Sequence, residues 1–78
     1  MILSIEAIAD NKCKDISEVA ITFDGEGLDI LLDRLNRLKQ RVDHDHLMTP
    51  AWGGNELTEI RQSVGESVLV NHLRLVRK

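Results

Sequence analysis

Apolar residues recur at helical spacing in one long stretch of the chain, residues 24–42. Asp24 is placed to cap its first turn, because an aspartate side chain accepts hydrogen bonds from the free amides of a helix start. Acidic residues precede basic ones, which suits the helix dipole, and Asp33 and Arg37 form an i,i+4 pair. The stretch predicts one amphipathic helix with Ile30 near its outer face. Its expected buried stripe comprises Leu28, Leu31, Leu32, Leu35, Leu38 and Val42.

Two stretches before this helix alternate between apolar and polar residues. Residues 1–9 and 17–23 each have the period of two that is typical of a strand. The polar residues 10–15 between them are typical of a turn, so the two strands are expected to form a hairpin. The residues predicted to face inward are Leu3, Ile5 and Ala7 in the first strand and Val19, Ile21 and Phe23 in the second.

Three strand-like stretches follow the helix, at residues 43–49, 56–62 and 67–76. In the first, Leu47 is expected to face the helix. The second is the weakest, because its apolar residues are out of phase for alternation, and a bulge or a helical turn fits equally well. The third is rich in β-branched residues. Proline and glycine at residues 50–55 predict a loop after the first of these stretches.

These elements predict an α+β fold with the order β-β-α-β-β-β in a single domain, residues 1–78. The expected architecture is one antiparallel sheet of four or five strands with the helix packed on one face. The opposite face is then solvated or covered by a partner. Its mixture of apolar and polar residues is either an interaction surface or an imperfect surface pattern. The apolar members are Ile2, Ile8, Ala20, Val68, Val70 and Val76.

Composition indicates the compartment of the protein and argues against several kinds of binding partner. Cys13 is the only cysteine, so no internal disulfide is expected, and a reducing compartment, the cytoplasm, is favoured. No apolar run has the length that spans a bilayer, and the first residues alternate like a strand and not like a signal peptide. The formal charge of −3 argues against general binding to nucleic acid or to a membrane surface.

The charge is unevenly distributed along the chain. Residues 1–33 carry eight acidic and two basic side chains, whereas residues 34–78 carry eight basic and five acidic ones. An acidic half can complement a basic partner such as a nuclease. The alternative is that these charges only keep a small protein soluble. We expect Glu26, Asp29 and Asp33, at the start of the helix, to contact such a partner.

His44 and His46 form an H-x-H pattern on one face of a predicted strand. Such a pair can bind zinc, and His72 would supply a third ligand if it shares that face. The alternatives are two surface histidines with no function, or polar contacts to a protein partner. We predict partner contacts and no bound metal.

Trp52 lies in the loop at residues 50–55. It is either an interface anchor, because tryptophan dominates binding hot spots, or a plug for one end of a thin core. We predict partner binding. Gly53 and Gly54 do not form a phosphate-binding loop, and no catalytic triad pattern is present. Cys13 is expected to be a plain surface thiol. We therefore expect no catalytic residue and no cofactor, and a protein that is not an enzyme.

Four segments together resemble small immunity proteins of bacterial polymorphic toxin systems, and in particular the Immunity protein 32 family. They are the helix GLDILLDRLNRLKQ, then HDHLMT, NELTE and the final VLVNHLRLVRK, which span about residues 27–78. The matching positions include the pairs His46–Leu47 and Leu57–Thr58. The resemblance implies a cytoplasmic protein that binds and neutralises a cognate toxin domain, often a nuclease, without catalysis.

The sequence therefore predicts an immunity protein that occludes the active site or the substrate path of a toxin. Two alternatives stay open. One is a small metal-binding or regulatory domain that uses the histidines. The other is a homodimer or larger homo-oligomer assembled through the open face of the sheet.

Overall fold

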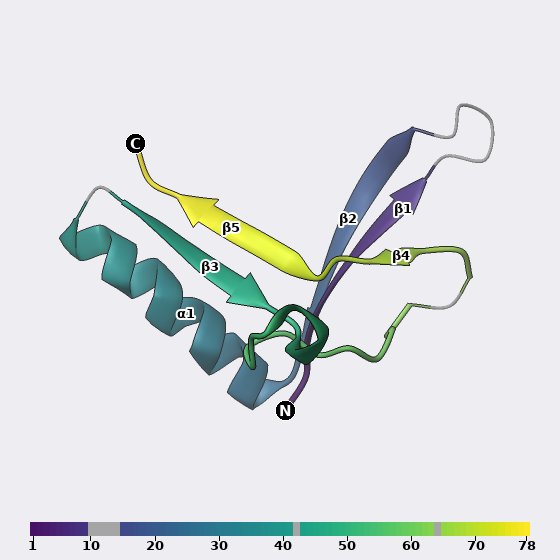
Figure 1. Cartoon of the computed structure of the whole chain (residues 1–78), viewed down its shortest axis with the longest axis horizontal. Coiled ribbons are helices and arrows are strands. Elements are labelled where there is room, and N and C mark those ends of the chain that lie inside the picture. The colour runs from purple at the N-terminus through teal and green to yellow at the C-terminus, as the bar shows by residue number, and fades with distance from the viewer. Residues whose placement is uncertain (10–14, 42, 64) are drawn as a thin grey trace.

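The computed structural model of the chain describes residues 1–9, 15–41, 43–63 and 65–78 (Figure 1). It confirms the α+β class and the order β-β-α-β-β-β. Residues 10–14 of the turn predicted at 10–15, with Cys13 among them, and Val42 lie outside the described residues. The elements are β1 (Leu3–Ala9), β2 (Ile16–Phe23), α1 (Gly25–Gln40), β3 (His44–Met48), the short 3₁₀ helix η1 (Pro50–Trp52), β4 (Val68–Leu69) and β5 (His72–Val76).

The five strands are divided between two antiparallel sheets, where a single sheet was expected. One sheet has the order β2-β1-β4, and the other pairs β3 with β5. In the described part of the chain, residues 56–62 form no strand. They run as an irregular segment beside β1, where Thr58 and Leu3 exchange two hydrogen bonds, at 2.7 and 2.9 Å.

The stretch 67–76, predicted as one strand, is split into β4 and β5 by a bend. The Val70 amide donates to the Ile5 carbonyl of β1 at 2.8 Å. One residue later, the Asn71 carbonyl accepts from the Thr49 amide at the end of β3, at 3.0 Å. This segment therefore passes from one sheet to the other, which is why the strands cannot share a single sheet. Val70, predicted on the open face, packs against the core instead. The register of β4 explains this, because Val68 lies opposite Ala7 and Val70, two residues later, lies on the same face as Ile5.

Helix α1 forms where the apolar spacing predicts it, and both of its ends have hydrogen-bond partners. The carboxylate of Asp24, the N-cap, accepts from the Gly27 amide at 2.8 Å. At the other end, the Arg77 guanidinium donates to the carbonyls of Leu38 and Lys39, at 2.8 and 3.1 Å. These bonds satisfy backbone groups that a helix leaves free at its ends. Within the described residues, no helix is long and apolar enough to cross a membrane.

Helix α1 is rotated about its axis relative to the predicted orientation. Gly27 and Leu38 are buried, and Ile30, which was expected near the outer face, packs against the core. A close approach at Gly27 accounts for this orientation, because a Cβ there would lie 1.8 Å from the Ile2 carbonyl oxygen. The side of the helix that bears glycine therefore lies against the start of the chain. The consequence is that three residues of the predicted buried stripe are exposed, namely Leu28, Leu32 and Leu35.

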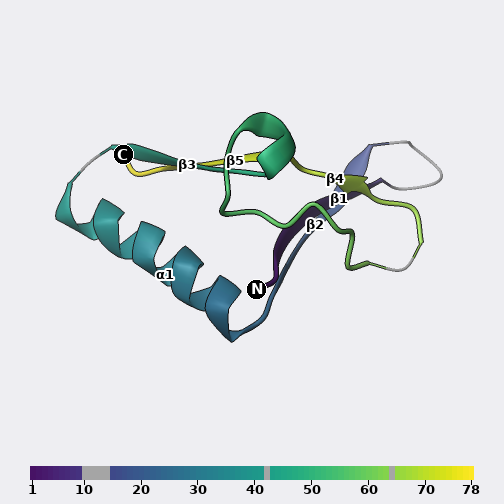
Figure 2. The same cartoon turned by 60° about the horizontal axis from the view of Figure 1, so that its bottom comes forward.

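The core is small and lies where β1, β3 and the irregular segment meet. Leu3 and Ile5 are buried there, as predicted, together with Leu47 and Leu57. Helix α1 covers this core but diverges from the β1–β2 hairpin after their junction (Figure 2). The far strand of the hairpin is therefore left uncovered. Three of its residues that were predicted to face inward are exposed, namely Val19, Ile21 and Phe23.

The opposite face of β1 is buried as well, although the sequence pattern left it uncovered. Glu6 is only 1% exposed. Its carboxylate accepts hydrogen bonds from the Ser67 hydroxyl at 2.5 Å and from the amides of Gln62 and Ser63 at 2.6 and 3.1 Å. The bond from Ser67, followed by that from Gln62, lowers the pKa of Glu6 from its ordinary 4.5 to about 2. The chain thus covers this face with its own segment.

Arg34 links the helix to two other parts of the chain. Its guanidinium nitrogens lie 3.2 Å from the Asp45 carboxylate of β3 and 3.6 Å from the carboxylate of Glu56. All three side chains are only about one-fifth exposed. The Glu56 carboxylate also accepts from the Met48 amide at 3.2 Å. The β3–β5 sheet is thereby held against the inner side of α1.

Candidate functional site

The outer face of the β3–β5 sheet carries three histidines. Leu47 is buried and Asp45 bonds to the helix, so the alternate residues of β3, at positions 44, 46 and 48, point away from α1. His44 and His46 lie on this outer face, as their alternation predicts. The β5 register places Met48 opposite His72, which brings the third histidine to the same face.

The three imidazole rings form a contiguous row. The His46 ring lies 4.9 Å from the His44 ring and 4.9 Å from the His72 ring, measured between centroids. His46 Nδ1 and His72 Nε2 are 2.7 Å apart, so one of these nitrogens donates a hydrogen bond to the other. These two nitrogens face each other and not a common third point. In the described ranges, no group of three or more His, Cys, Asp or Glu side chains is arranged to hold a metal ion.

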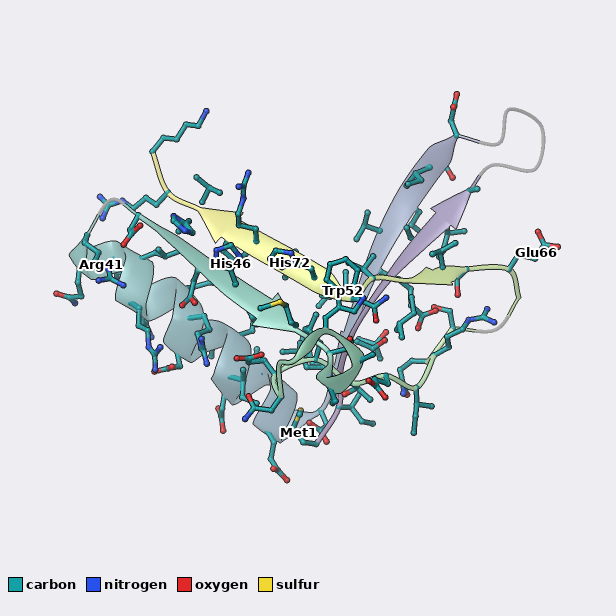
Figure 3. All side chains as sticks on the ribbon, viewed as in Figure 1. Met1, Arg41, His46, Trp52, Glu66 and His72 are labelled. Atoms are coloured by element: carbon teal, nitrogen blue, oxygen red, sulfur yellow. The ribbon has the colours of Figure 1, made fainter. Side chains whose placement is uncertain are left out.

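Trp52 extends this row beyond His72. The two rings lie 6.3 Å apart between centroids, and Figure 3 shows Trp52 beside His72 and His46. The indole is 59% exposed. Trp52 therefore does not plug the core, which was one of the two interpretations of the sequence. We call the face formed by His44, His46, Trp52 and His72 the histidine–tryptophan surface.

The loop that carries Trp52 is held by several hydrogen bonds. Buried Thr49 anchors its start, because the Thr49 hydroxyl bonds to the Asn71 side chain at 2.8 Å. The amides of Trp52 and Gly54 then donate to the Thr49 carbonyl at 2.9 and 3.0 Å. Gly53 between them has φ of +85°, which favours glycine. The indole is therefore presented from a tightly bonded turn.

Gly54 allows this turn to lie close to the end of β3. A Cβ on Gly54 would lie 2.4 Å from the Met48 carbonyl oxygen. The glycines of the loop therefore serve the backbone path. Their effect is to place Trp52 next to the histidines.

The acidic residues predicted for partner binding lie elsewhere. Glu26, Asp29 and Asp33 are exposed on α1, which packs on the inner side of the β3–β5 sheet. We call these three residues the acidic flank. Asp33 already pairs with Arg37 at 3.2 Å, as the i,i+4 spacing predicts. The six predicted site residues therefore belong to two surfaces on different sides of the molecule.

Charged residues border the histidine–tryptophan surface at its β3 end. The His44 amide donates to Asp43 and holds the pKa of that carboxyl below its usual range. The ionised carboxylate lies 3.1 Å from His44 Nδ1 and 3.5 Å from Arg41 Nε. The surface thus combines hydrogen-bonding imidazoles, an exposed indole and charges of both signs. Such a mixture is typical of protein-binding sites, in which tryptophan and arginine are enriched.

Two residues of importance were not predicted as site residues. His72 was considered only as a third metal ligand. Its place beside His46 follows from the pairing of residues 43–49 with 67–76, so a correct strand register would have identified it. Arg34 was not singled out at all. Its position, seven residues after Gly27 on the same side of the helix, is the one signal that it faces inward.

The described residues thus form an α+β fold with two antiparallel sheets, one α-helix and an exposed surface suited to binding. The family model of Immunity protein 32 matches residues 18–73, and the chain belongs to this family. No curated protein and no solved structure matches the chain. The family assignment made from the helix and the segments after it is confirmed.

Proposed function

We propose that the protein binds a cognate toxin domain in the cytoplasm and neutralises it by occluding its active site or its substrate path. The observation that carries this proposal is the family match over most of the chain, which suggests an immunity function. The protein acts by binding and not by catalysis. In this proposal it contacts neither nucleic acid nor membrane directly.

The histidine–tryptophan surface is the surface we assign to the toxin. Trp52 is the anchor, because a large and rigid indole loses little conformational entropy on binding and buries a large apolar area. The imidazoles beside it donate and accept hydrogen bonds around the anchor. An interface of ordinary size covers about 800 Å² of each partner. The histidine–tryptophan surface is then the centre of an interface that takes roughly one-seventh of the 5524 Å² of accessible surface.

The acidic flank has a different role in the proposal. It lies on another side of the molecule, and its charges act at a distance of about one Debye length, roughly 8 Å at physiological salt. If the toxin is a basic nuclease, Glu26 and Asp29 attract it before contact and raise the association rate. The rate should then fall as salt is added, whereas the dissociation rate should change little.

Co-expression with the toxin tests the proposed function. The toxin domain encoded beside this gene is expressed in bacteria with and without the protein, and growth and co-elution are measured. Rescue of growth together with a co-eluting complex is expected. A harmful neighbouring domain that this protein neither rescues nor binds would refute the proposed function.

Single substitutions then test the assignment of the surface. Trp52→Ala should weaken binding by about 30-fold or more, the loss that a central tryptophan typically causes. Because the indole is exposed, thermal unfolding of this variant should stay close to that of the unchanged protein. Asp29→Asn is the matched control, since it alters the other surface. It should lower the association rate at low salt and leave the dissociation rate unchanged. Equal affinity for Trp52→Ala and the unchanged protein would move the toxin site away from this surface.

A further inference from the structure

Strand β2 has the pattern of a buried strand but is exposed. Its apolar residues Ile16, Val19, Ile21 and Phe23 are between 42% and 66% exposed. Register pairing places Val19, Ile21 and Phe23 opposite Ala7, Ile5 and Leu3 of β1, respectively, on the side of the sheet that forms the core. The core face of β1 thus continues onto β2 without any cover. An alternating apolar strand of this kind needs a second layer or a further neighbouring strand, and the described residues of one chain provide neither.

Strand β2 is also the least protected edge in the described structure. It lies at the end of the order β2-β1-β4, so one side of its backbone has no strand neighbour. The other end of this sheet is β4, which has only two residues, and β3 and β5 have five each. Natural proteins protect an edge with lysine, proline, a bulge or a short strand. The eight residues of β2 include no lysine and no proline. The pairing of β2 with β1 has one register shift, opposite Ile8 and Ala9 at one end of the strand, and residues 18–23 pair regularly. These residues are the part of the edge without such protection.

Helix α1 adds to the uncovered apolar surface directly after β2. Its exposed leucines at positions 28, 32 and 35 form one flank of the helix, because they are four and three residues apart. Of the twelve exposed large hydrophobic residues in the described chain, seven belong to β2 and α1. The apolar exposure is therefore concentrated in two consecutive elements.

The accessible surface area of the chain is larger than that of a typical folded monomer of the same mass. The accessible surface is 5524 Å² for a chain of 8.8 kDa. A folded monomer of this mass exposes roughly 4,800 Å². The excess is roughly 700 Å², which is close to the 800 Å² or so that each partner buries in a standard interface.

We propose that two copies of this chain pair through antiparallel β2 strands and form a six-stranded sheet across a two-fold axis. The register is centred on Ala20, which faces Ala20 of the second copy. Val19 of each copy then lies opposite Ile21 of the other, and Glu18 lies opposite Thr22. No like charges face each other in this register, and the apolar residues of both copies share one face.

The second copy is the occupant that the observations favour. An edge strand can pair with itself only in the antiparallel direction, and the alternation of β2 is compatible with this symmetry. The apolar surface also needs cover whether or not a toxin is present, and a second copy is always available. The pairing leaves the histidine–tryptophan surface free in each copy, because that surface lies on β3, β5 and the loop between residues 49 and 54.

Mass measurement tests the pairing. Multi-angle light scattering on the full chain should give twice the 8.8 kDa chain mass. Val19→Lys places a charge on the shared apolar face and should shift the mass to that of one chain, with a circular dichroism spectrum that shows the fold is retained. Ile60→Lys is the matched control, since Ile60 is 71% exposed in the irregular segment, and it should leave the mass doubled. A monomeric mass at all concentrations would overturn the proposal, and so would a dimer that Val19→Lys leaves intact.

Cross-linking tests the register with a readout that does not depend on stability. In a Cys13→Ser background, Ala20→Cys should form an intermolecular disulfide under mild oxidation, because directly opposite residues have Cα atoms about 5 Å apart. Glu18→Cys is the control and should not cross-link, since its counterpart in the second copy is four residues away along the strand. A cross-link at position 18 and none at position 20 would contradict this register.

The pairing and the proposed toxin binding can fail independently. Val19→Lys should still bind the toxin domain, as one copy for each toxin. Loss of toxin binding in a folded Val19→Lys monomer would mean that β2 belongs to the toxin interface, and this would overturn the assignment of β2 to a second copy.

Discussion

Two glycines in the first turn of α1 should respond to alanine in opposite directions. Gly25 and Gly27 are both helical, and alanine is favoured over glycine in a helix by about 1 kcal/mol. A Cβ on Gly25 meets nothing within 4 Å. A Cβ on Gly27 meets the Ile2 carbonyl oxygen at 1.8 Å and the Phe23 Cβ at 3.2 Å. Helix propensity alone therefore predicts the same gain at both positions, and packing predicts a loss at Gly27.

The size of the loss at Gly27 follows from what must move. Ordinary contact begins near 3.4 Å, so the helix start or the Ile2 peptide has to shift by more than 1 Å. Overpacking of this kind costs about 1–3 kcal/mol. The shift also strains the bond from the Asp24 amide to the Ile2 carbonyl, now 3.1 Å, which is worth about 1 kcal/mol. After subtraction of the propensity gain, Gly27→Ala should destabilise the fold by about 2 kcal/mol.

Urea unfolding followed by circular dichroism measures both variants. With a slope of about 1 kcal/mol/M for a domain of this size, the midpoint for Gly27→Ala should fall by about 2 M. The melting temperature should fall by about 10 °C. Gly25→Ala should unfold at the same urea concentration as the unchanged protein or at a higher one. A midpoint for Gly27→Ala that equals or exceeds that of Gly25→Ala would refute the close approach of the helix to the first residues.

Three further predictions concern the links that hold the small core. Arg34→Met should lower the free energy of unfolding by about 1–2 kcal/mol, because two largely buried carboxylates lose their partner. Arg37→Met should change it by less than about 0.5 kcal/mol, and urea unfolding compares the two variants. The pKa of Glu6 is about 2 in the folded protein, so its ionised carboxylate stabilises the fold fully above pH 4.5, and this contribution is lost as the pH falls toward 2. The melting temperature of the unchanged protein should therefore fall over this pH range more than that of Glu6→Gln. Leu57→Ala should cost about 3 kcal/mol by thermal unfolding, and exposed Ile60→Ala should be close to neutral.

The sequence could predict the elements because their signals are local. The spacing of the leucines and the carboxylate of Asp24 depend only on residues a few positions apart, so the start of α1 was located correctly. The alternation around Leu47 likewise placed His44 and His46 on the outer face of β3. The position of Trp52 beside the histidines was not predictable, because it depends on a turn that two glycines and the Thr49 hydrogen bonds shape.

The expected single sheet under one helix was incorrect, and so was the expected burial of β2 that followed from it. A single sheet would have buried Val19, Ile21 and Phe23 under α1. The bend at Val70 and Asn71 instead sends β5 to β3, and α1 follows β3 away from β2. Sequence periodicity indicates that a face is apolar, but it does not indicate which other element reaches that face.

The sequence by itself determined the family, the order of the elements, the capped helix and the faces on which the alternating residues of β1 and β3 lie. Each of these depends on residue type and on short-range spacing. Tertiary structure decided the division into two sheets, the rotation of α1 at Gly27, the burial of Glu6 and the meeting of three histidines with Trp52. These features depend on contacts between residues far apart in the chain, from 20 positions for Trp52 and His72 to 61 for Glu6 and Ser67. Such contacts are set by which surfaces can approach one another once the chain is folded.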